Sequence, residues 1–292
     1  MSSDAQAAPE AFRVAAEEWR PGPVETTDTV TALPASTFAA LLDEPSPVTA
    51  AGDPLPPLWH WFLFPSVYPQ SALGADGHPA DAAFTPPLPE RRRMFGGGRL
   101  SVTAPLRCGE TVTRRSSLAS VRTREGGSGW LLLVTVRHEF AVADDVRLVE
   151  EQDLVYRRPE DVVNPAVPPQ PGGAVPAAPW QFTLTPDPVL LFRFSALTSN
   201  AHRIHYDRPY ATGVEGHAGL VVHGPLLALL LLEPPRRFAP DRAVETFRWR
   251  ARRPLFETDL VEVRGEPEND RAVLRAGAGR APDAVTGEVT YR

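Results

Sequence analysis

Apolar and polar residues alternate along several stretches in the first half of the chain. A period of two is typical of strands that bury one face. It predicts strands over residues 99–106, 110–121, 130–140 and 146–156. A glycine-rich turn signal at 126–129 separates the second strand from the third. A helical pattern at 35–42 precedes these strands, so we expect one helix followed by an antiparallel meander.

The second half repeats this order. It predicts a short strand at 180–185, a helix or buried turn at 188–198, a strongly apolar helix at 225–232, and strands at 246–254, 258–266, 271–276 and 285–292. The apolar helix offers no polar face to solvent, so other elements must cover it on nearly all sides. The pattern therefore favours an internal duplication of an antiparallel sheet around a buried helix.

The segment between the halves is rich in proline and glycine, which removes backbone donors and side-chain packing. We interpret it as a linker. The predicted organisation is an N-terminal extension at 1–34, a first domain at 35–158, a linker at 159–179 and a second domain at 180–292.

Composition narrows the class of protein. A net charge of −6 and a pI near 5.7 argue against a nucleic-acid partner, which requires a basic surface. The single cysteine, Cys108, excludes an internal disulfide and any multi-cysteine metal site. The longest apolar run, 218–232, is too short to span a membrane, and the first twenty residues resemble no signal peptide. We expect a soluble cytoplasmic protein without a membrane partner.

The candidate chemistry lies in the second half. Asn200 stands five residues before His205, and Gly224 with Pro225 opens the apolar helix. A histidine with a near-neutral pKa is suited to move protons in both directions. Backbone N–H groups at a helix start can accept developing negative charge. This combination predicts a general base beside an oxyanion site.

Residues 200–207 resemble the signature of the MaoC-like hydratases and dehydratases. In that family an acidic residue is followed five positions later by a catalytic histidine, and two further on by Asp or Asn. His205 and Asp207 match the last two positions, whereas Asn200 departs from the first.

A wider resemblance covers roughly residues 35 to 292. Residues 192–198, 202–207 and 219–225 look like the hydroxyacyl-thioester dehydratase type 2 subgroup, which includes mesaconyl-CoA and itaconyl-CoA hydratases. Residues 56–61 and 91–98 are similar to the fungal-synthase-like dehydratase domain that precedes it in that subgroup. The resemblance implies an α+β double hot-dog, with two antiparallel sheets that each wrap around a central helix.

The resemblance also implies roles. His205 would be the acid–base group, Asn200 would hold the reacting water or serve as a turn-stabilising cap, and Gly224 would donate to the thioester carbonyl or simply begin the helix. Asp207 would cap a helix or orient the imidazole. The expected substrate-binding residues are Arg91, Arg92 and Arg93, either on coenzyme phosphates or on a solvated face, with Trp59, Val222 and His223.

The leading functional hypothesis is a hydro-lyase acting on an enoyl or 3-hydroxyacyl thioester. A short branched dicarboxylic acyl-CoA is one candidate substrate. We expect no metal and no redox cofactor, with coenzyme A or the phosphopantetheine of an acyl carrier protein as part of the substrate, and we allow for a homodimer. A thioesterase and a non-catalytic acyl-thioester binding or assembly subunit are the alternatives, since one fold hosts several functions.

Overall fold

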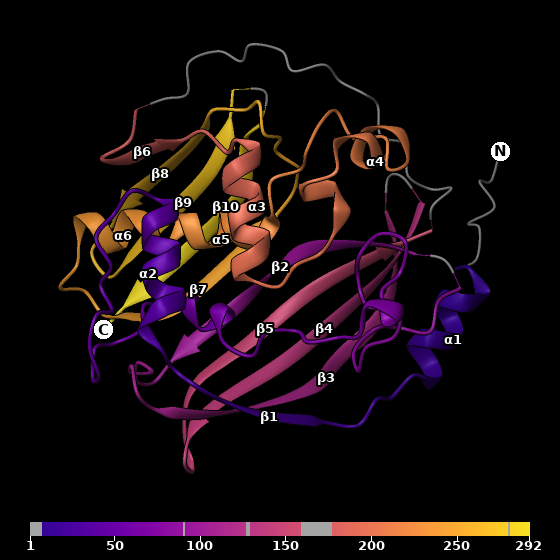
Figure 1. Ribbon diagram of the computed structural model, residues 1–292, viewed down its shortest axis with the longest axis horizontal. Helices are drawn as coiled ribbons and strands as arrows, with labels where there is room; N and C mark the ends of the chain where they lie inside the picture. The colour runs from indigo at the N-terminus through magenta and orange to yellow at the C-terminus, as the bar shows by residue number, and fades with distance from the viewer. Residues whose placement is uncertain (1–7, 90, 127–128, 159–176, 280) are drawn as a thin grey trace.

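The computed structural model describes residues 8–89, 91–126, 129–158, 177–279 and 281–292. Their ten strands form one antiparallel sheet with the order β1-β3-β4-β5-β2-β7-β10-β9-β8-β6 (Figure 1). The bounds are β1 Val24–Thr29, β2 Arg92–Val102, β3 Thr111–Gly126, β4 Gly129–Val142, β5 Asp145–Arg157, β6 Trp180–Leu184, β7 Val244–Ala251, β8 Val261–Pro267, β9 Arg271–Ala278 and β10 Ala281–Tyr291.

The strand order shows the internal duplication. The first five strands run β1-β3-β4-β5-β2 and the last five, read inward, run β6-β8-β9-β10-β7, so each strand of one half has a counterpart in the other. The halves join where β2 pairs with β7. There Gly97 lies opposite Arg250, and Gly98 opposite Trp249.

Two glycines allow this joining. Gly97 has a φ of +142°, and a Cβ on it would lie 2.3 Å from the carbonyl oxygen of Trp249. A Cβ on Gly98 would lie 2.5 Å from the Trp249 ring. No other residue type fits such close backbone approach. The structure therefore uses these two glycines to join the two halves.

The second half surrounds the apolar helix as predicted. This helix, α5 (Gly224–Leu231), is buried from Leu226 to Leu231 and packs against β8, β9 and β10. α6 (Glu233–Phe238) follows it. Burial of six consecutive side chains removes a large apolar area from water and stabilises this half.

The first half differs from the prediction of one central helix per half. α2 (Ala32–Leu41) contacts α3 (Pro188–Leu197) of the second half. The place that α5 holds in chain order, just before the central strand, is taken by the 3₁₀ turn η1 (Trp59–Phe62). Its flanks explain why it stays short. Prolines lie on both sides, and Leu58 and Phe64 have positive φ values of 68° and 56°, which a helix cannot contain.

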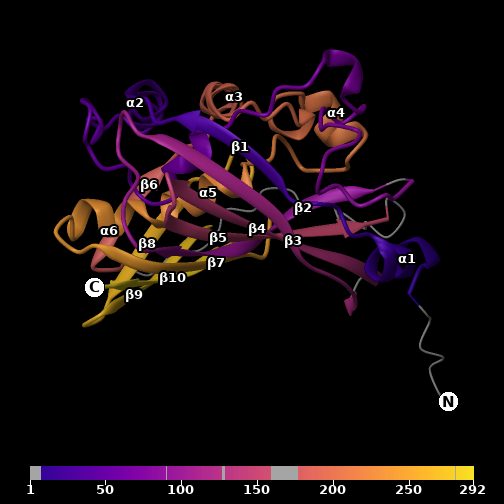
Figure 2. The ribbon, with the colours of Figure 1, turned by 90° about the horizontal axis from the view of Figure 1, so that it is seen from below.

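The N-terminal segment contributes more than the predicted extension. β1 pairs with β3, so the first sheet begins at Val24 rather than at residue 35. α1 (Glu10–Glu18) buries Phe12 and Ala15 and contacts β3 and β4. Figure 2 shows it near the end of the sheet away from α2, where Phe12 and Ala15 pack against Leu132, Val134 and Val136. The sequence missed both elements, because α1 has only nine residues and β1 is short and mostly polar.

The predicted linker at 159–179 lies largely outside the described residues. Within those described, the structure holds no helix that is long and apolar enough to cross a membrane. Two short elements of the second half, η4 (Arg203–His205) and α4 (Arg208–Gly213), lie at the candidate site, and η2 (Gln70–Ala72) lies in the long loop of the first half.

Candidate active site

His205 lies in η4, between α3 and α4, and its side chain is buried. Its Nδ1 is 2.7 Å from the carbonyl oxygen of Val221. A carbonyl only accepts, so Nδ1 must carry the hydrogen and Nε2 must carry the lone pair. Among the described residues, no protein group makes a hydrogen bond to Nε2. The free nitrogen is therefore an acceptor that remains available for a substrate or water.

His205 stacks on His223, the residue that precedes α5. The ring centroids are 3.6 Å apart and the planes are inclined by 17°. His223 is fully buried, and its Nε2 lies 2.8 Å from Oγ of Ser195 on α3. The structure thus brings the His205 ring to the beginning of the apolar helix.

Burial controls the charge of these rings. It lowers the pKa of His205 to about 3, and the charge of nearby His202 adds to the effect, against the opposing hydrogen bond with Val221. Burial also lowers the pKa of His223 well below its ordinary value. Both rings are therefore neutral at neutral pH, and Nε2 of His205 carries an unprotonated lone pair.

Asn200 follows the end of α3 and lines a cavity. Its Oδ1 accepts the backbone N–H of His202 at 3.0 Å, which is the turn-stabilising contact that the sequence allowed. The amide NH₂ makes no hydrogen bond to any described residue. One side chain therefore offers both functions: its oxygen holds the turn, and its NH₂ group is left for another partner beside the cavity that Asn200 lines.

The cavity has a volume of about 230 Å³ and lies between the two halves. The second half contributes Phe194, Leu197, Thr198, Asn200 and Pro225, and the first half contributes residues 60–66, Arg93, Phe95, Arg114, His138, Phe140, Glu150 and Gln152. His205 and Gly224 adjoin these residues in sequence or space but do not line the cavity in the described part of the chain. η1 forms one wall, so the short turn leaves room that a full helix would fill.

Gly224 is the first residue of α5. Its N–H has no acceptor within the helix, because first-turn amides lack one. A Cβ at this position would lie 3.0 to 3.1 Å from the side chain of Phe95 on β2. Glycine therefore allows close contact between the halves, and its N–H is left without an acceptor in the helix.

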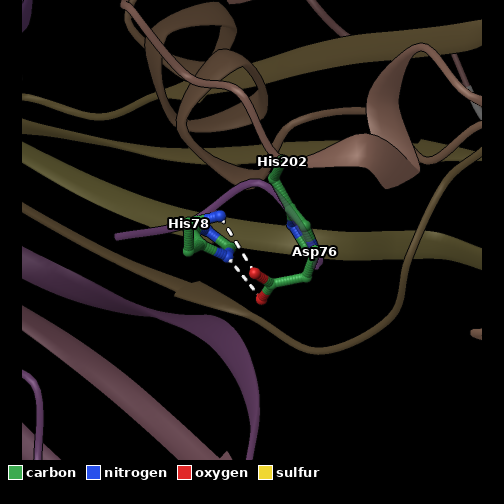
Figure 3. Close-up of side chains that lie close together, drawn as sticks. All are labelled: Asp76, His78 and His202. Carbon is green, nitrogen blue, oxygen red and sulfur yellow. Dashed lines mark hydrogen bonds and ion pairs between the residues drawn. The ribbon is translucent and has the colours of Figure 1, made fainter. Parts of the chain in front are cut away.

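A second group of polar side chains lies beside His205. Asp76 and His78, from a loop of the first half, meet His202 (Figure 3). The Asp76 carboxylate is 3.0 Å from Nδ1 of His78, and the ring centroids of His78 and His202 are 4.1 Å apart. Although burial alone would raise the pKa of Asp76, its hydrogen bond with His78 holds that pKa well below the usual range.

This loop is fixed to the candidate site by its backbone. The carbonyl of Asp76 accepts the N–H of Arg203 at 2.9 Å, and Gly77 has a φ of +90° and touches Ala201. Each of Asp76, His78 and His202 offers one donor atom within 4.8 Å of the others, and imidazole and carboxylate are ordinary zinc ligands. The sequence did not reveal this group, because nothing in the 123 residues between His78 and His202 signals that they meet.

Asp207 has the local role considered from the sequence. It accepts the N–H of Tyr210 at 3.1 Å as the N-cap of α4 and forms an ion pair with Arg203 at 2.7 Å. The His205 ring is oriented by Val221 instead.

The three arginines predicted to bind phosphate separate in the structure. Arg91 donates to the carbonyls of Leu88 and Ala80. Arg92 donates to the carbonyl of Glu215, in the second half, at 2.9 Å. Arg93 is exposed and lines the cavity. The first two arginines therefore hold loops together, and of the three only Arg93 lines the cavity.

Trp59 and Val222 are packing residues. Trp59 is buried with its ring edge against Phe38, at a centroid distance of 5.1 Å, and it does not line the cavity described above. It borders a larger apolar cavity of about 670 Å³ near α6. Val222 is buried, and its N–H donates to the carbonyl of Leu255 at 2.8 Å.

Comparison with known proteins gives consistent results. A family model described as hydroxyacyl-thioester dehydratase type 2 matches residues 58–257. The chain is 44% identical over 262 residues to the mesaconyl-C(4)-CoA hydratase of Chloroflexus aurantiacus, covering 90% of this chain and 91% of that protein. It is 28% identical over 236 residues to the mitochondrial hydroxyacyl-thioester dehydratase type 2 of Schizosaccharomyces pombe, covering 72% and 77%.

Solved structures share the fold at low identity. The HtdX protein of Mycobacterium tuberculosis matches with a TM-score of 0.64 and 15% identity, covering 91% of this chain and 99% of that chain. A second protein of that organism, described as having a double hotdog fold, matches with a TM-score of 0.55 and 14% identity, covering 93% and 96%. The α+β double hot-dog expected from the sequence is confirmed.

Proposed function

The chain belongs to the hydroxyacyl-thioester dehydratase type 2 family, and on this premise we propose that His205 is the acid–base group of its reaction. The protein is a hydro-lyase that adds or removes water at the α and β carbons of an acyl thioester. The observation that carries the assignment to His205 is its neutral ring, held by Val221 with Nε2 free beside the start of α5.

In the hydration direction, Nε2 of His205 takes a proton from a water molecule that the NH₂ group of Asn200 orients. The water oxygen bonds to the β carbon, and the electron pair of the double bond moves toward the thioester carbonyl. The N–H of Gly224, at the positive end of α5, stabilises the resulting enolate oxygen. Dehydration follows the same steps in reverse.

Because Asn200 has no proton to exchange, one group must serve both ends of the reaction. The imidazolium formed on His205 returns its proton to the α carbon, which completes the addition of water and restores the neutral ring. Low pKa favours this return, since a weakly basic imidazole gives up its proton readily. No carboxylate is needed in this scheme.

The substrate class is a further part of the proposal. The 44% identical relative is named for a mesaconyl thioester, and the cavity of about 230 Å³ suits a short acyl group. We therefore assign a short branched dicarboxylic acyl thioester of coenzyme A to this chain, with an acyl carrier protein as the alternative carrier. Cytoplasmic location, the absence of a cofactor and a homodimer stay predictions.

The test follows two signals in one assay. Purified protein is mixed with crotonyl-CoA or mesaconyl-C(4)-CoA while enoyl absorbance and free thiol are recorded separately. We expect absorbance to fall without thiol release, and His205→Gln to lower the rate by about a thousandfold or more. His217→Gln is the matched control, expected to keep the rate. Thiol release would indicate a thioesterase, and an active His205→Gln variant would refute the assigned base.

A further inference from the structure

The inner face of the first half carries polar side chains where the second half is apolar. Ser116 on β3 lies opposite His138 on β4, which lies opposite Glu150 on β5. Oγ of Ser116 is 2.8 Å from Nδ1 of His138. In the second half, the strands facing α5 instead bury apolar side chains such as Val263 and Leu274. A polar floor under a cavity indicates that the first half binds a polar group.

The Glu150 carboxylate on this polar face already accepts hydrogen bonds from three side chains. Glu150 is completely buried and accepts from His60 Nε2 at 2.6 Å, Trp61 Nε1 at 2.8 Å and Gln152 Nε2 at 2.8 Å. Although burial would raise the pKa of Glu150, the hydrogen bond with His60 lowers it below the usual range. An ionised carboxylate with three donors has little capacity left for another partner.

Arg114 lies in the same cavity and has no such partners. Its guanidinium carbon is 4.6 Å from the ring centroid of Phe64, and within the described residues it forms neither a hydrogen bond nor an ion pair. Its Nε is buried without any acceptor. An arginine stays charged even when burial lowers its pKa, so a positive charge without a close partner faces the cavity.

The next residue shows that this isolation is specific to the inner face. Arg115 points away from the cavity along the same strand and pairs with Glu25 at 3.0 Å. Alternation along β3 therefore gives Arg115 a carboxylate in contact, whereas Arg114 makes no ion pair with any described residue. Glu150, Tyr68 and Asp28 act on Arg114 through space, without an ion pair or hydrogen bond to its guanidinium.

From these observations we propose that Arg114 binds the free carboxylate of a dicarboxylic acyl thioester and selects such substrates over monocarboxylic ones. A guanidinium matches a carboxylate with two parallel hydrogen bonds, and Arg114 offers all of its donors. Asn200 lines the same cavity, which places the acyl group between the water-orienting amide and this arginine. The inference rests on the proposed hydro-lyase function and adds its specificity determinant.

The experiment compares two substrates across three variants. Mesaconyl-C(4)-CoA carries a free carboxylate and crotonyl-CoA does not. We expect Arg114→Gln to lower kcat/KM for mesaconyl-C(4)-CoA by about 30- to 100-fold, mainly through KM, because a charged hydrogen-bonded pair is lost. The value for crotonyl-CoA should stay within about twofold of wild type. Arg114→Lys keeps the positive charge but loses the planar pair of N–H donors, so its kcat/KM for mesaconyl-C(4)-CoA should lie between those of Arg114→Gln and wild type. Arg115→Gln should match wild type on both substrates.

The possible outcomes distinguish a failure of the Arg114 proposal from a failure of the proposed hydro-lyase function. Equal losses on both substrates would mean that Arg114 only balances Glu150, and an unchanged value for mesaconyl-C(4)-CoA would also overturn the proposal. If Arg114→Gln fails to fold, the substrate ratio measured with Arg114→Lys decides. A wild-type enzyme that hydrates crotonyl-CoA alone refutes the carboxylate site and leaves the hydro-lyase intact. Activity on neither substrate, at any concentration tested, refutes the proposed function itself.

Discussion

The ring of His205 lies nearly parallel to that of His223, with 3.6 Å between their centroids. Two imidazolium ions this close would repel strongly in a buried site. The stack therefore opposes protonation of either ring. It also ties the candidate base to the residue that begins α5, so the base and the backbone donor of Gly224 are positioned by one element.

The rate should be insensitive to pH around neutrality. Because burial lowers the pKa of His205 to about 3, its basic form is complete well below pH 6. We expect kcat/KM for hydration to be flat from about pH 5 to about pH 8, instead of falling near 6.5 as for an exposed histidine. A profile with an acidic limb at 6.5 would show that the ring titrates normally and that the stacked pair does not control it.

The stability of the folded protein should, unlike the rate, decrease as the pH falls below about 6.5. The pKa values of His202 and His205 are lowered to about 3 and that of His138 to about 4, each chiefly by burial. Between these values and about 6.5 the unfolded chain binds more protons than the folded one, so stability is complete above 6.5 and is lost as pH falls. Urea unfolding at about pH 7.5 and about pH 5 measures this effect, with a lower midpoint expected at the acidic pH.

One variant provides the control for that effect. His138→Gln removes a buried group that titrates only in the unfolded chain, while its hydrogen bond to Ser116 can be retained by the amide. We expect a smaller difference between the two midpoints than in wild type. An equal or larger difference would assign the acid sensitivity to carboxylates instead.

Asn200→Ala tests the water-holding role. Loss of one positioned polar group should lower kcat by about a hundredfold. The turn also loses its contact with His202, so the thermal midpoint is measured on the same sample. Asn269→Ala makes the same change at an exposed position and should keep both values. If Asn200→Ala were as active as Asn269→Ala, the amide would have only its turn-stabilising role.

Gly224→Ala tests the contact between the halves. The new Cβ would lie 3.0 Å from Phe95, and such overpacking costs about 1–3 kcal/mol. We expect a lower thermal midpoint and a reduced rate, with the midpoint partly restored by the added change Phe95→Leu. Gly213→Ala, on another helix where a Cβ meets nothing within 4 Å, is the matched control. Because alanine keeps the backbone N–H, a full rate with a lower midpoint would show that the glycine serves the contact with Phe95 and not the reaction.

Much of the fold follows from patterns within single segments. The apolar run of α5 requires cover on all sides, and the alternation in β3, β4, β5 and β7 to β10 predicts a duplicated sheet. Elements without such a pattern were missed. β1 is a six-residue polar edge strand, and the predicted start of the central strand at residue 99 was late, because Arg92 and Arg93 look like a solvated charge run although they begin β2.

The candidate site likewise contains residues that the sequence identified and residues that it did not. Asn200, His205 and Gly224 lie in one short stretch of sequence and its following helix, so spacing and family resemblance identified them. Asp76 and Arg114 come from distant segments of the first half. Nothing in their local sequence distinguishes Arg114 from Arg115, since only the pleat of β3 decides which one faces the cavity.

At Gly97 and Gly98, β2 pairs with β7, so the two hot-dog units of this polypeptide share one continuous sheet. In an assembly of identical subunits, every substitution appears twice, so a leucine helix lost from one copy is lost from the other. Fusion removes that constraint. The second half of this chain keeps the apolar helix α5, which positions the candidate base. The first half has the short turn η1 in its place, beside the cavity. Joining the two units in one chain therefore lets each half have a different role.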